Sequence, residues 1–538
     1  MRGSDLLIQT LSDLGTNQIF CLSGNQIMAI FDSSIESNID LIHFRHEAAA
    51  VHAADTWGRL TNQPGIAMVT AGPGFANTLS ALYVAMSAES PMVLISGHAQ
   101  LAEQGKGAFQ EMPQADMARP VTKSSWTCTN TEKIGYDIER ACQIATTGRP
   151  GPVHIAIPVD ILEAELISNS PIKYQTTNSN FKSITKSETQ TLIEALNSAN
   201  RPLALLGQGI NRLAKSRISE ELLSARVPMI NMESPRGVND PSLGAFPEVL
   251  KESDLILLLG KKLDFGLKFG DDSVLSSNAA IIHVDHDISV LEQARKAISR
   301  SERLIVSSQS DPLLTLNILN SPDIIVSQKW VCQVQSALKY KPQEWAILEN
   351  STKSPMHPLT VCKPIQEIFH NQKNAVFISD GGEFGQWTQA SISTPNRIIN
   401  GPSGAIGSSV PAAIAASIAR PEATVIAMLG DGTFGFHCME FDTAIRYNLR
   451  FVTIIGNDAK WNAEHQIQLR DYGSDRTIGC ELNSSRYDLV VKALGGHGEN
   501  VENSSEFAPA LKRAINSDLP SCINVSINPA KAPSIKRS

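Results

Sequence analysis

Short apolar runs alternate with helical patterns along most of the chain, and they fall into three blocks. The apolar runs of the first block are residues 18–22, 39–44, 65–70, 91–96 and 153–157. Those of the second are residues 202–206, 227–231, 254–259, 280–285 and 303–307, and those of the third are residues 375–378, 424–429, 451–455 and 522–527. Alternation of strand and helix predicts parallel sheets covered by helices on both faces. The predicted fold class is therefore α/β, with three doubly wound parallel-sheet domains.

Two polar stretches separate these blocks. Residues 166–188 are rich in Ser, Thr and Asn and predict a linker, and a second polar, proline-containing stretch runs from about residue 328 to residue 358. A chain of 538 residues is also too long for a single hydrophobic core. We expect an N-terminal domain over 1–165, a central domain over 188–325 and a C-terminal domain over 355–531, each of ordinary domain size.

Composition and charge narrow the class of protein. The chain is 42% hydrophobic and 19% charged, with a net charge of −8 and no basic tract, so nucleic acid and anionic membranes are not expected partners. Its eight cysteines lack zinc or CxxC spacing and predict reduced thiols in a cytoplasmic protein. The first residues, MRGSDLLIQTLSDLG, predict an amphipathic helix rather than a signal peptide. No apolar run reaches the ~18–20 residues that span a bilayer.

Residues 424–462 carry the most informative pattern. One apolar strand ends in Gly430-Asp431-Gly432, and a second ends in Gly456-Asn457-Asp458, which places Asp458 27 residues after Asp431. One βαβ crossover of this length can bring both carboxylates to the carboxyl edge of a parallel sheet, where such folds bind ligands. Two carboxylates with a turn carbonyl and a diphosphate would suit Mg²⁺, and the glycines let the backbone approach phosphates. The alternative is a tight turn followed by an ordinary loop.

This segment resembles the thiamine-diphosphate motif, in which GDG is followed about 25 residues later by NN. The rest of the chain is similar to the acetolactate-synthase-like branch of that superfamily, which includes 2-hydroxyacyl-CoA lyases, benzaldehyde lyase and acetolactate synthase large subunits. The resemblance implies an enzyme that uses thiamine diphosphate and Mg²⁺, with the metal bound by Asp431, Asp458 and the main-chain carbonyl of Lys460. Asp458 stands where the family usually has Asn, and a second carboxylate still suits a hard cation.

The resemblance also assigns contacts to the cofactor. In NGPSGAIGSSVPAAIAASIA (400–419), Ile406 matches the bulky residue that holds the cofactor bent, and the carbonyl of Gly404 would accept from its exocyclic amine. The alternative for Ile406 is core packing. The residues implied to bind the cofactor are Glu47, Gly72, Pro73, Gly381, Gly382, Glu383, Gly404, Ile406, Gly430, Asp431, Gly432, Thr433, Asp458 and Trp461.

Glu47, in FRHEAAAVHAADTWGRL, is the predicted catalytic carboxylate. Thiamine diphosphate becomes reactive when a carboxylate bonds its aminopyrimidine ring, and an apolar setting raises the proton affinity of that carboxylate. Glu47 lies between the strand 39–44 and an alanine-rich helix. The alternative is a helix-start Glu that favours the helix dipole.

TAGPGFANTLSALYVA (70–85) resembles the family's TSGPGxxN turn, a glycine-rich strand-to-helix connection near the cofactor, and the alternative is a generic α/β turn. Other segments are implied to surround the substrate. GAFQEMPQADMARPVTKSSW (107–126) resembles the GAFQE loop, which places Phe109 in the substrate pocket and Gln110 in a catalytic role. The resemblance adds Gln26 as a catalytic residue and, as pocket residues, Asn25, Asn462, His465 and Gln466. A solvated turn for Asn25 and Gln26, and a structural histidine for His465, are the alternatives.

The substrate-selecting positions depart from acetolactate synthase. The stretch LGKKLDFGLKFG (259–270) lacks the expected Arg, and Ile467 stands where a Trp would be. These departures favour a lyase or carboligase acting on 2-hydroxy carbonyl or 2-hydroxyacyl-CoA compounds. Two alternatives stay open, a 2-oxo acid decarboxylase and carboligase of acetolactate synthase type, and a catalytically silent cofactor-binding subunit. The resemblance implies a homodimer or homotetramer with the active site between subunits. The lone Gly207-Gln208-Gly209 leaves FAD or ADP in the central domain undecided.

Overall fold

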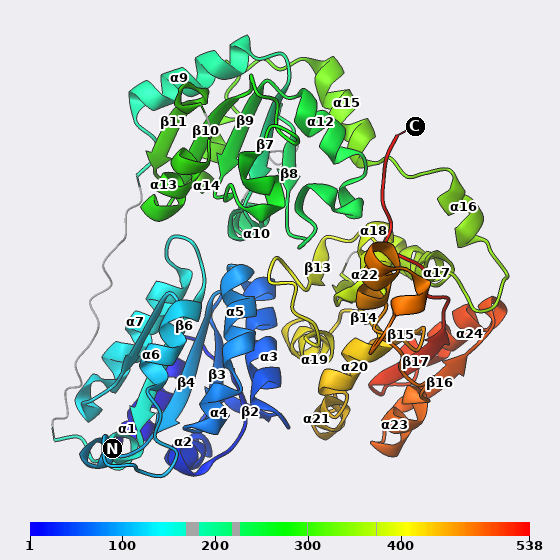
Figure 1. Ribbon diagram of the computed structural model, residues 1–538. Helices are drawn as coiled ribbons and strands as arrows, with labels where there is room; N and C mark the ends of the chain where they lie inside the picture. The colour runs from blue at the N-terminus through cyan, green and yellow to red at the C-terminus, as the bar shows by residue number, and fades with distance from the viewer. Residues whose placement is uncertain (168–181, 218–225, 299, 373, 538) are drawn as a thin grey trace. The chain divides into compact units, whose positions relative to one another are not determined.

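The computed structural model describes residues 1–167, 182–217, 226–298, 300–372 and 374–537. Three sheets stand out, and each has helices around it (Figure 1). Every strand pair in them is parallel, which confirms the predicted α/β class. The expected linker at 166–188 lies largely outside the described residues.

The first sheet has six strands in the order β2-β1-β3-β4-β6-β5. Its strands are β1 (Gln18–Cys21), β2 (Asp40–His43), β3 (Gly65–Val69), β4 (Met92–His98), β5 (Ser124–Thr127) and β6 (Pro152–Pro158). Its helices are α1 (Gly3–Asp13), α2 (Met28–Ser34), α3 (Glu47–Thr61), α4 (Pro73–Ala76), α5 (Leu79–Ser87), α6 (Gln114–Ala118), α7 (Ile134–Thr146) and α8 (Val159–Glu163).

The second sheet has five strands in the order β11-β10-β9-β7-β8. Its strands are β7 (Pro202–Leu206), β8 (Met229–Asn231), β9 (Leu255–Leu259), β10 (Ala280–Asp285) and β11 (Leu304–Gln309). The helices of this part of the chain are α9 (Lys186–Ser198), α10 (Gln208–Arg217), α12 (Phe246–Glu252), α13 (Ile288–Ala297), α14 (Pro312–Ile318) and α15 (Gln328–Leu338), and α16 (Glu344–Glu349) follows them.

The third sheet has six strands in the order β13-β12-β14-β15-β17-β16. Its strands are β12 (Val376–Ser379), β13 (Asn396–Ile399), β14 (Val425–Gly430), β15 (Val452–Asn457), β16 (His497–Val501) and β17 (Ser521–Ser526). Its helices are α17 (Pro358–Asn371), α18 (Gly382–Ser391), α19 (Ser409–Ala419), α20 (Asp431–His437), α21 (Glu440–Arg446), α22 (Asn462–Tyr472), α23 (Tyr487–Ala493) and α24 (Ser504–Ile515).

The chain divides into two compact units. Residues 1–177 and 348–532 form one unit, and residues 178–347 with 533–538 form the other. The first and third sheets thus belong to the same unit, whose main core cluster includes alanines of both α3 and α19, such as Ala49, Ala53, Ala412 and Ala416. Small side chains of this kind let two helices pack closely. The three predicted domain boundaries remain a prediction.

The structure adds elements that the pattern did not predict. The expected strands omit β5, β13 and β16, which all lie at sheet edges. The polar stretch from residue 328 to 358 contains α15 and α16. Trp330, Val334 and Ala337 on α15 are buried in the core of the second unit. Among the described helices, none combines the length and apolar character needed to cross a membrane.

Candidate functional site

Asp431 and Asp458 lie at the carboxyl ends of two neighbouring strands, as predicted. β14 pairs with β15 in a register that sets Gly430 opposite Gly456. Asp431 then begins α20, and Asp458 directly follows β15. Asp431 is 2% exposed, and its Oδ2 atom is buried with no hydrogen-bond partner among the described residues.

The electrostatics of this pair follow from its burial. Burial raises the pKa of Asp431 to about 6, although nearby backbone amides, including those of Gly432 and Ala459, lower it. Burial and then the charge of Asp431 raise the pKa of Asp458 to about 7. Burial of the pair and the charge of Asp431 beside Asp458 disfavour ionisation, and a cation would stabilise both carboxylates.

The residues around the two carboxylates hold the second strand end in place. Asn457 is turned into the protein, where its Nδ2 donates to the carbonyl of Ser485 at 3.0 Å and to Oδ1 of Asn524 at 3.1 Å. Ala459 has a φ of 55°, a strained conformation for a residue other than glycine. The side chain of Lys460 points to Glu481, with which it forms an ion pair, so the main-chain carbonyl is what Lys460 has left to offer a metal.

The loop after Asp431 is packed against Trp461. A Cβ atom at Gly432 would lie 2.6 Å from the Trp461 ring, which explains the glycine. Thr433 Oγ1 donates to the carbonyl of Gly430 at 2.8 Å and stabilises the start of α20. This close packing brings four of the predicted residues together at one edge of the third sheet.

A second pair of loops at this sheet is joined by Asp380, which the sequence analysis did not single out. Its fully buried carboxylate accepts from the amides of Gly381 at 2.8 Å, Gly407 at 3.1 Å and Ser409 at 3.2 Å. Burial raises its pKa, and these hydrogen bonds lower it. A Cβ atom at Gly381 would lie 2.8 Å from Cγ2 of Ile406. The structure therefore places the predicted residues Gly381 and Ile406 in contact.

Two neighbouring glycines of these loops have open space where a side chain would be. Gly382 and Gly404 have φ values of 79° and 67°, and nothing lies within 4 Å of a Cβ built on either. Glycine is thus required at both positions by the backbone rather than by crowding. Glu383 lies in the first turn of α18, directly after Gly382.

Glu47 is the first residue of α3 and is half-buried. Its Oε2 accepts from Nδ2 of Asn77 at 3.0 Å, and a Cβ atom at Gly74 would lie 3.3 Å from Oε1. Both partners come from the glycine-rich turn at 70–77, which the sequence analysis placed in the same region without naming Asn77. Among the described residues, no hydrogen bond or ion pair joins Glu47 to Asp431 or Asp458.

The other predicted residues of the first sheet cluster near this turn. A Cβ atom at Gly72 would lie 2.7 Å from the carbonyl of Gln110, and Gly72 N donates to Oε1 of the fully buried Gln114 at 2.8 Å. Pro73 follows as the first residue of α4. Gln26 is buried and its Oε1 accepts from Thr70 Oγ1 at 2.6 Å, so it is not a solvated turn residue.

Comparison with known proteins agrees with this geometry. A model of the N-terminal TPP binding domain of thiamine pyrophosphate enzymes matches residues 1–117, and one of their C-terminal TPP binding domain matches residues 380–525. A probable acetolactate synthase of Mycobacterium bovis is 31% identical over 99% of this chain and 97% of its own length.

The chain belongs to the thiamine pyrophosphate enzyme family. Thiamine pyrophosphate and thiamine diphosphate are two names for the same compound. Other relatives include 2-hydroxyacyl-CoA lyase 2 of Xenopus laevis, 28% identical over 98% of this chain and 92% of that protein. The human 2-hydroxyacyl-CoA lyase 2 is 26% identical over 94% of this chain and 86% of its own length. The expected membership in a thiamine-diphosphate-dependent lyase or transferase family is thus confirmed.

The residues present fit the family's cofactor. The unpartnered, buried oxygen of Asp431 beside a second carboxylate suits a cation that would bridge to a diphosphate. The open positions at Gly382 and Gly404 leave the backbone accessible to a ligand. The donor set is therefore complete enough for a metal and a diphosphate at this sheet edge.

The predicted pocket residues have mixed surroundings. Asn462 and Gln466 donate to the main-chain carbonyls of Ala530 and Pro529 and bond to each other, so their amides hold the C-terminal segment against α22. His465 Nδ1 is buried and has no hydrogen-bond partner within the described ranges. Phe109 is 72% exposed, and Asn25 is exposed. These two side chains are free to meet a ligand or another chain.

Proposed function

We propose that this chain is a carbon–carbon lyase or carboligase that depends on thiamine diphosphate and Mg²⁺ and acts on 2-hydroxy carbonyl or 2-hydroxyacyl-CoA compounds. The observation that carries the proposal is the pair Asp431 and Asp458, adjacent at the ends of β14 and β15, with one buried oxygen left without a partner. This arrangement is costly unless a cation binds between the carboxylates. Glu47 supplies the second requirement of thiamine chemistry.

The residues of the third sheet would hold the cofactor. Asp431, Asp458 and the carbonyl of Lys460 would bind Mg²⁺, and the metal would help to hold the diphosphate. The open position at Gly382 would give the diphosphate room, and Asp380 fixes that loop relative to the loop of Ile406. When bound, the cofactor supplies an electron sink next to a carbonyl carbon.

The residues of the first sheet would move and orient protons. Glu47 exchanges a proton with the aminopyrimidine ring, while the amide of Asn77 holds one of its oxygens. Gln110 and Gln26 are the residues that we propose to orient a substrate carbonyl. Gln26 is held by Thr70, so its Nε2 is directed away from that contact and available as a donor.

The choice of substrate class rests on positions that select it. This chain lacks the Arg expected in 259–270 and has Ile467 in place of a Trp, which disfavours the selection of a second 2-oxo acid. The names of the mycobacterial relatives favour the second candidate, 2-oxo acid decarboxylation with carboligation of acetolactate synthase type. The names of the vertebrate relatives favour the first.

A substrate panel separates these candidates. The reconstituted protein is incubated with pyruvate, 2-hydroxy ketones and 2-hydroxyacyl-CoA thioesters, and carbon dioxide, aldehyde and formyl-CoA are measured. Cleavage of a 2-hydroxyacyl-CoA supports our proposal, whereas pyruvate consumption with carbon dioxide release supports the alternative. No turnover of any compound by protein that binds the cofactor supports a catalytically silent subunit.

We also propose a homodimer or homotetramer in which Glu47 of one chain faces Asp431 of another. The carboxylate of Glu47 bonds only to Asn77 among the described residues, which fits a site completed by a second chain. A mixture of inactive Glu47→Gln and Asp431→Asn proteins tests this. Subunit exchange would create one intact site per mixed dimer and restore activity, whereas sites within single chains would stay inactive.

Binding of a further cofactor, FAD or ADP, in the central domain is a separate question. Gly207 follows β7, and a Cβ atom there would lie 2.1 Å from the carbonyl of Gly260. Close backbone packing therefore accounts for this glycine without a nucleotide. FAD or ADP binding stays a prediction, which a flavin absorption spectrum and analysis of nucleotide released on denaturation would test.

A further inference from the structure

We propose that Glu440 is a positioning residue that fixes the backbone turn from which Glu47 projects. The inference rests on the proposed role of Glu47. Glu440 begins α21 and is 1% exposed, so its carboxylate is withdrawn from solvent. A buried carboxylate of this kind is stable only where hydrogen bonds satisfy its oxygens.

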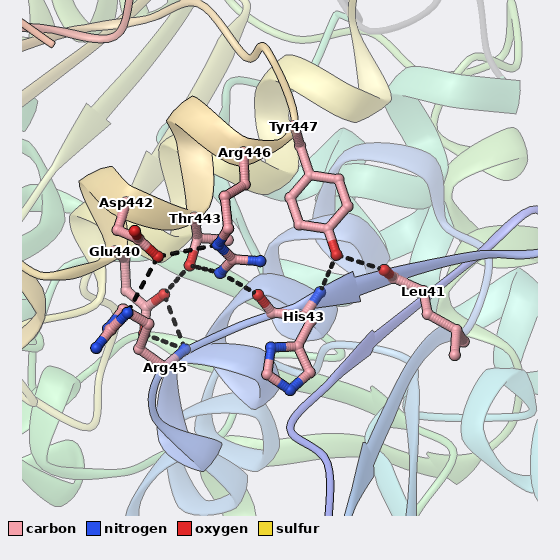
Figure 2. Close-up of polar contacts among 8 residues, drawn as sticks. All are labelled: Leu41, His43, Arg45, Glu440, Asp442, Thr443, Arg446 and Tyr447. Atoms are coloured by element: carbon pink, nitrogen blue, oxygen red, sulfur yellow. Dashed lines mark hydrogen bonds and ion pairs between the residues drawn. The ribbon is translucent and has the colours of Figure 1, made fainter. Parts of the chain in front are cut away.

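The partner of Glu440 is the main chain just before α3 (Figure 2). The amide of Arg45 donates to Oε1 at 3.1 Å and to Oε2 at 3.2 Å. Thr443 Oγ1 donates to Oε2 at 2.6 Å, which orients the carboxylate. Glu47 lies two residues after Arg45 and begins the helix.

Two more side chains, at the last residue of α21 and directly after it, bond to the main chain of β2 just before this turn, as Figure 2 shows. Tyr447 Oη accepts from the amide of His43 at 2.8 Å and donates to the carbonyl of Leu41 at 2.7 Å. Arg446 Nη2 donates to the carbonyl of His43 at 2.6 Å. The main chain at residues 41, 43 and 45 is therefore fixed by side chains from the third sheet's part of the unit.

This network differs from an ordinary surface contact. The nearby ion pair between Arg45 and Asp442 joins side chains that are 50% and 30% exposed, and such pairs contribute little. Glu440 and Tyr447 instead bond to main-chain groups of residues 41, 43 and 45, shortly before Glu47. α20, which begins with Asp431, ends at His437, three residues before Glu440. The consecutive helices α20 and α21 thus carry the proposed metal ligand Asp431 and fix the turn before Glu47.

Exchange of the C2 proton of bound thiamine diphosphate for deuterium tests this role without a known substrate. In the holoenzyme with Mg²⁺, Glu440→Ala leaves the Arg45 amide without its acceptor. We expect this exchange to slow by roughly 10- to 100-fold, because small displacements of a catalytic group carry penalties of this order. Glu440→Gln keeps one carbonyl oxygen and should recover part of the rate. Cofactor affinity should stay within about threefold of the wild type, since the ligands of the diphosphate lie elsewhere.

Two further variants keep the test decisive if Glu440→Ala does not fold. Tyr447→Phe removes two main-chain contacts without removing a charge and should slow the exchange several-fold. Asp518→Asn removes only an exposed ion pair, with Arg450, and should exchange like the wild type. Wild-type exchange rates in folded Glu440→Gln and Tyr447→Phe would overturn the proposal, as would parallel losses of rate and cofactor affinity. If the wild type itself does not accelerate the exchange and Glu47→Gln changes nothing, the proposed function fails instead.

Discussion

The two carboxylate centres of the large unit have different surroundings. Glu47, at the start of α3, is half-buried, and one amide from Asn77 holds one of its oxygens. Asp431, at the start of α20, is 2% exposed and keeps one oxygen without a partner beside Asp458. Both begin helices that follow parallel strands, so local secondary structure alone does not distinguish them.

The difference shows what each centre can do. A single accessible carboxylate with a neutral neighbour can exchange a proton with an organic ring. A buried carboxylate and a half-buried one that repel each other are suited to a cation. The unit therefore separates proton exchange from metal binding, and substitutions should separate them too.

Glu47→Gln should give the largest effect. The amide cannot exchange a proton with the cofactor, so turnover should fall by roughly 10²- to 10⁴-fold. Binding of thiamine diphosphate and Mg²⁺ should change little, because the proposed ligands of the metal and of the diphosphate group are on the third sheet. Steady-state kinetics and calorimetric titration measure the two quantities separately, and a variant that keeps wild-type turnover would refute the assignment.

Asp431→Asn, unlike Glu47→Gln, should act mainly on metal binding. Metal affinity should fall by at least about 100-fold, because a direct ligand is lost. The melting temperature of the metal-free protein should stay constant or rise, because a buried charge that Asp458 repels is removed. Asp442→Asn, which removes an exposed carboxylate on α21, is the control and should leave metal affinity unchanged. A large drop in metal-free stability would instead assign Asp431 a structural role.

Asp458→Asn restores the residue that the family usually has and should have a milder effect. One carboxylate fewer should weaken Mg²⁺ binding by about tenfold, which corresponds to about 1.4 kcal/mol. Turnover at saturating Mg²⁺ should remain near that of the wild type. Titration of the metal in the presence of the cofactor measures the change, and unchanged affinity would show that Asp458 does not contact the ion.

The smallest effect concerns acid stability and the first sheet. Burial lowers the pKa of His154 to about 3, and its ring bonds Ser96 and Ser125. Below its usual value of 6.5 the unfolded chain binds a proton that the folded protein excludes, so stability is present above pH 6.5 and falls as the pH drops toward 3. His154→Gln should reduce the slope of unfolding free energy against pH by about 1.4 kcal/mol per pH unit in that window.

Urea unfolding at several pH values measures this slope. His370→Gln, at an exposed position near the end of α17, is the control and should keep the wild-type slope. A slope unchanged by His154→Gln would show that His154 does not resist protonation in the folded state.

The fold could be predicted for the central strands, and the strands that were missed all lie at an edge. The central strands β3, β4, β14 and β15 are nearly uniform apolar runs, because helices cover both faces. The edge strands β2, β8 and β11 were also predicted, whereas the missed edge strands β5, β13 and β16 include polar sequences such as SSWT and HGENV. An edge strand needs no apolar pattern, so periodicity can miss it.

The candidate site could be predicted where a motif states the chemistry. The GDG turn and the second strand end placed Asp431 and Asp458 on neighbouring strands, and RHE placed Glu47 at the start of a helix. Asp380 and Glu440 could not be identified in this way, because their importance depends on main-chain groups brought to them by the fold. An acidic residue that ends a buried apolar strand, as Asp380 does after β12, is the one signal the sequence offered for these two. Asn77 is the last residue of the TSGPGxxN match, and the fold adds its contact with the side chain of Glu47.

Calorimetric titration of thiamine diphosphate into the metal-free protein tests the central claim most directly. With Mg²⁺ present the account predicts saturable binding, and with a chelator in place of Mg²⁺ it predicts binding weaker by at least about 100-fold. The double variant Asp431→Asn and Asp458→Asn should bind weakly under both conditions. Equal affinity with and without Mg²⁺, in wild type and variant alike, would contradict the assignment of these two carboxylates.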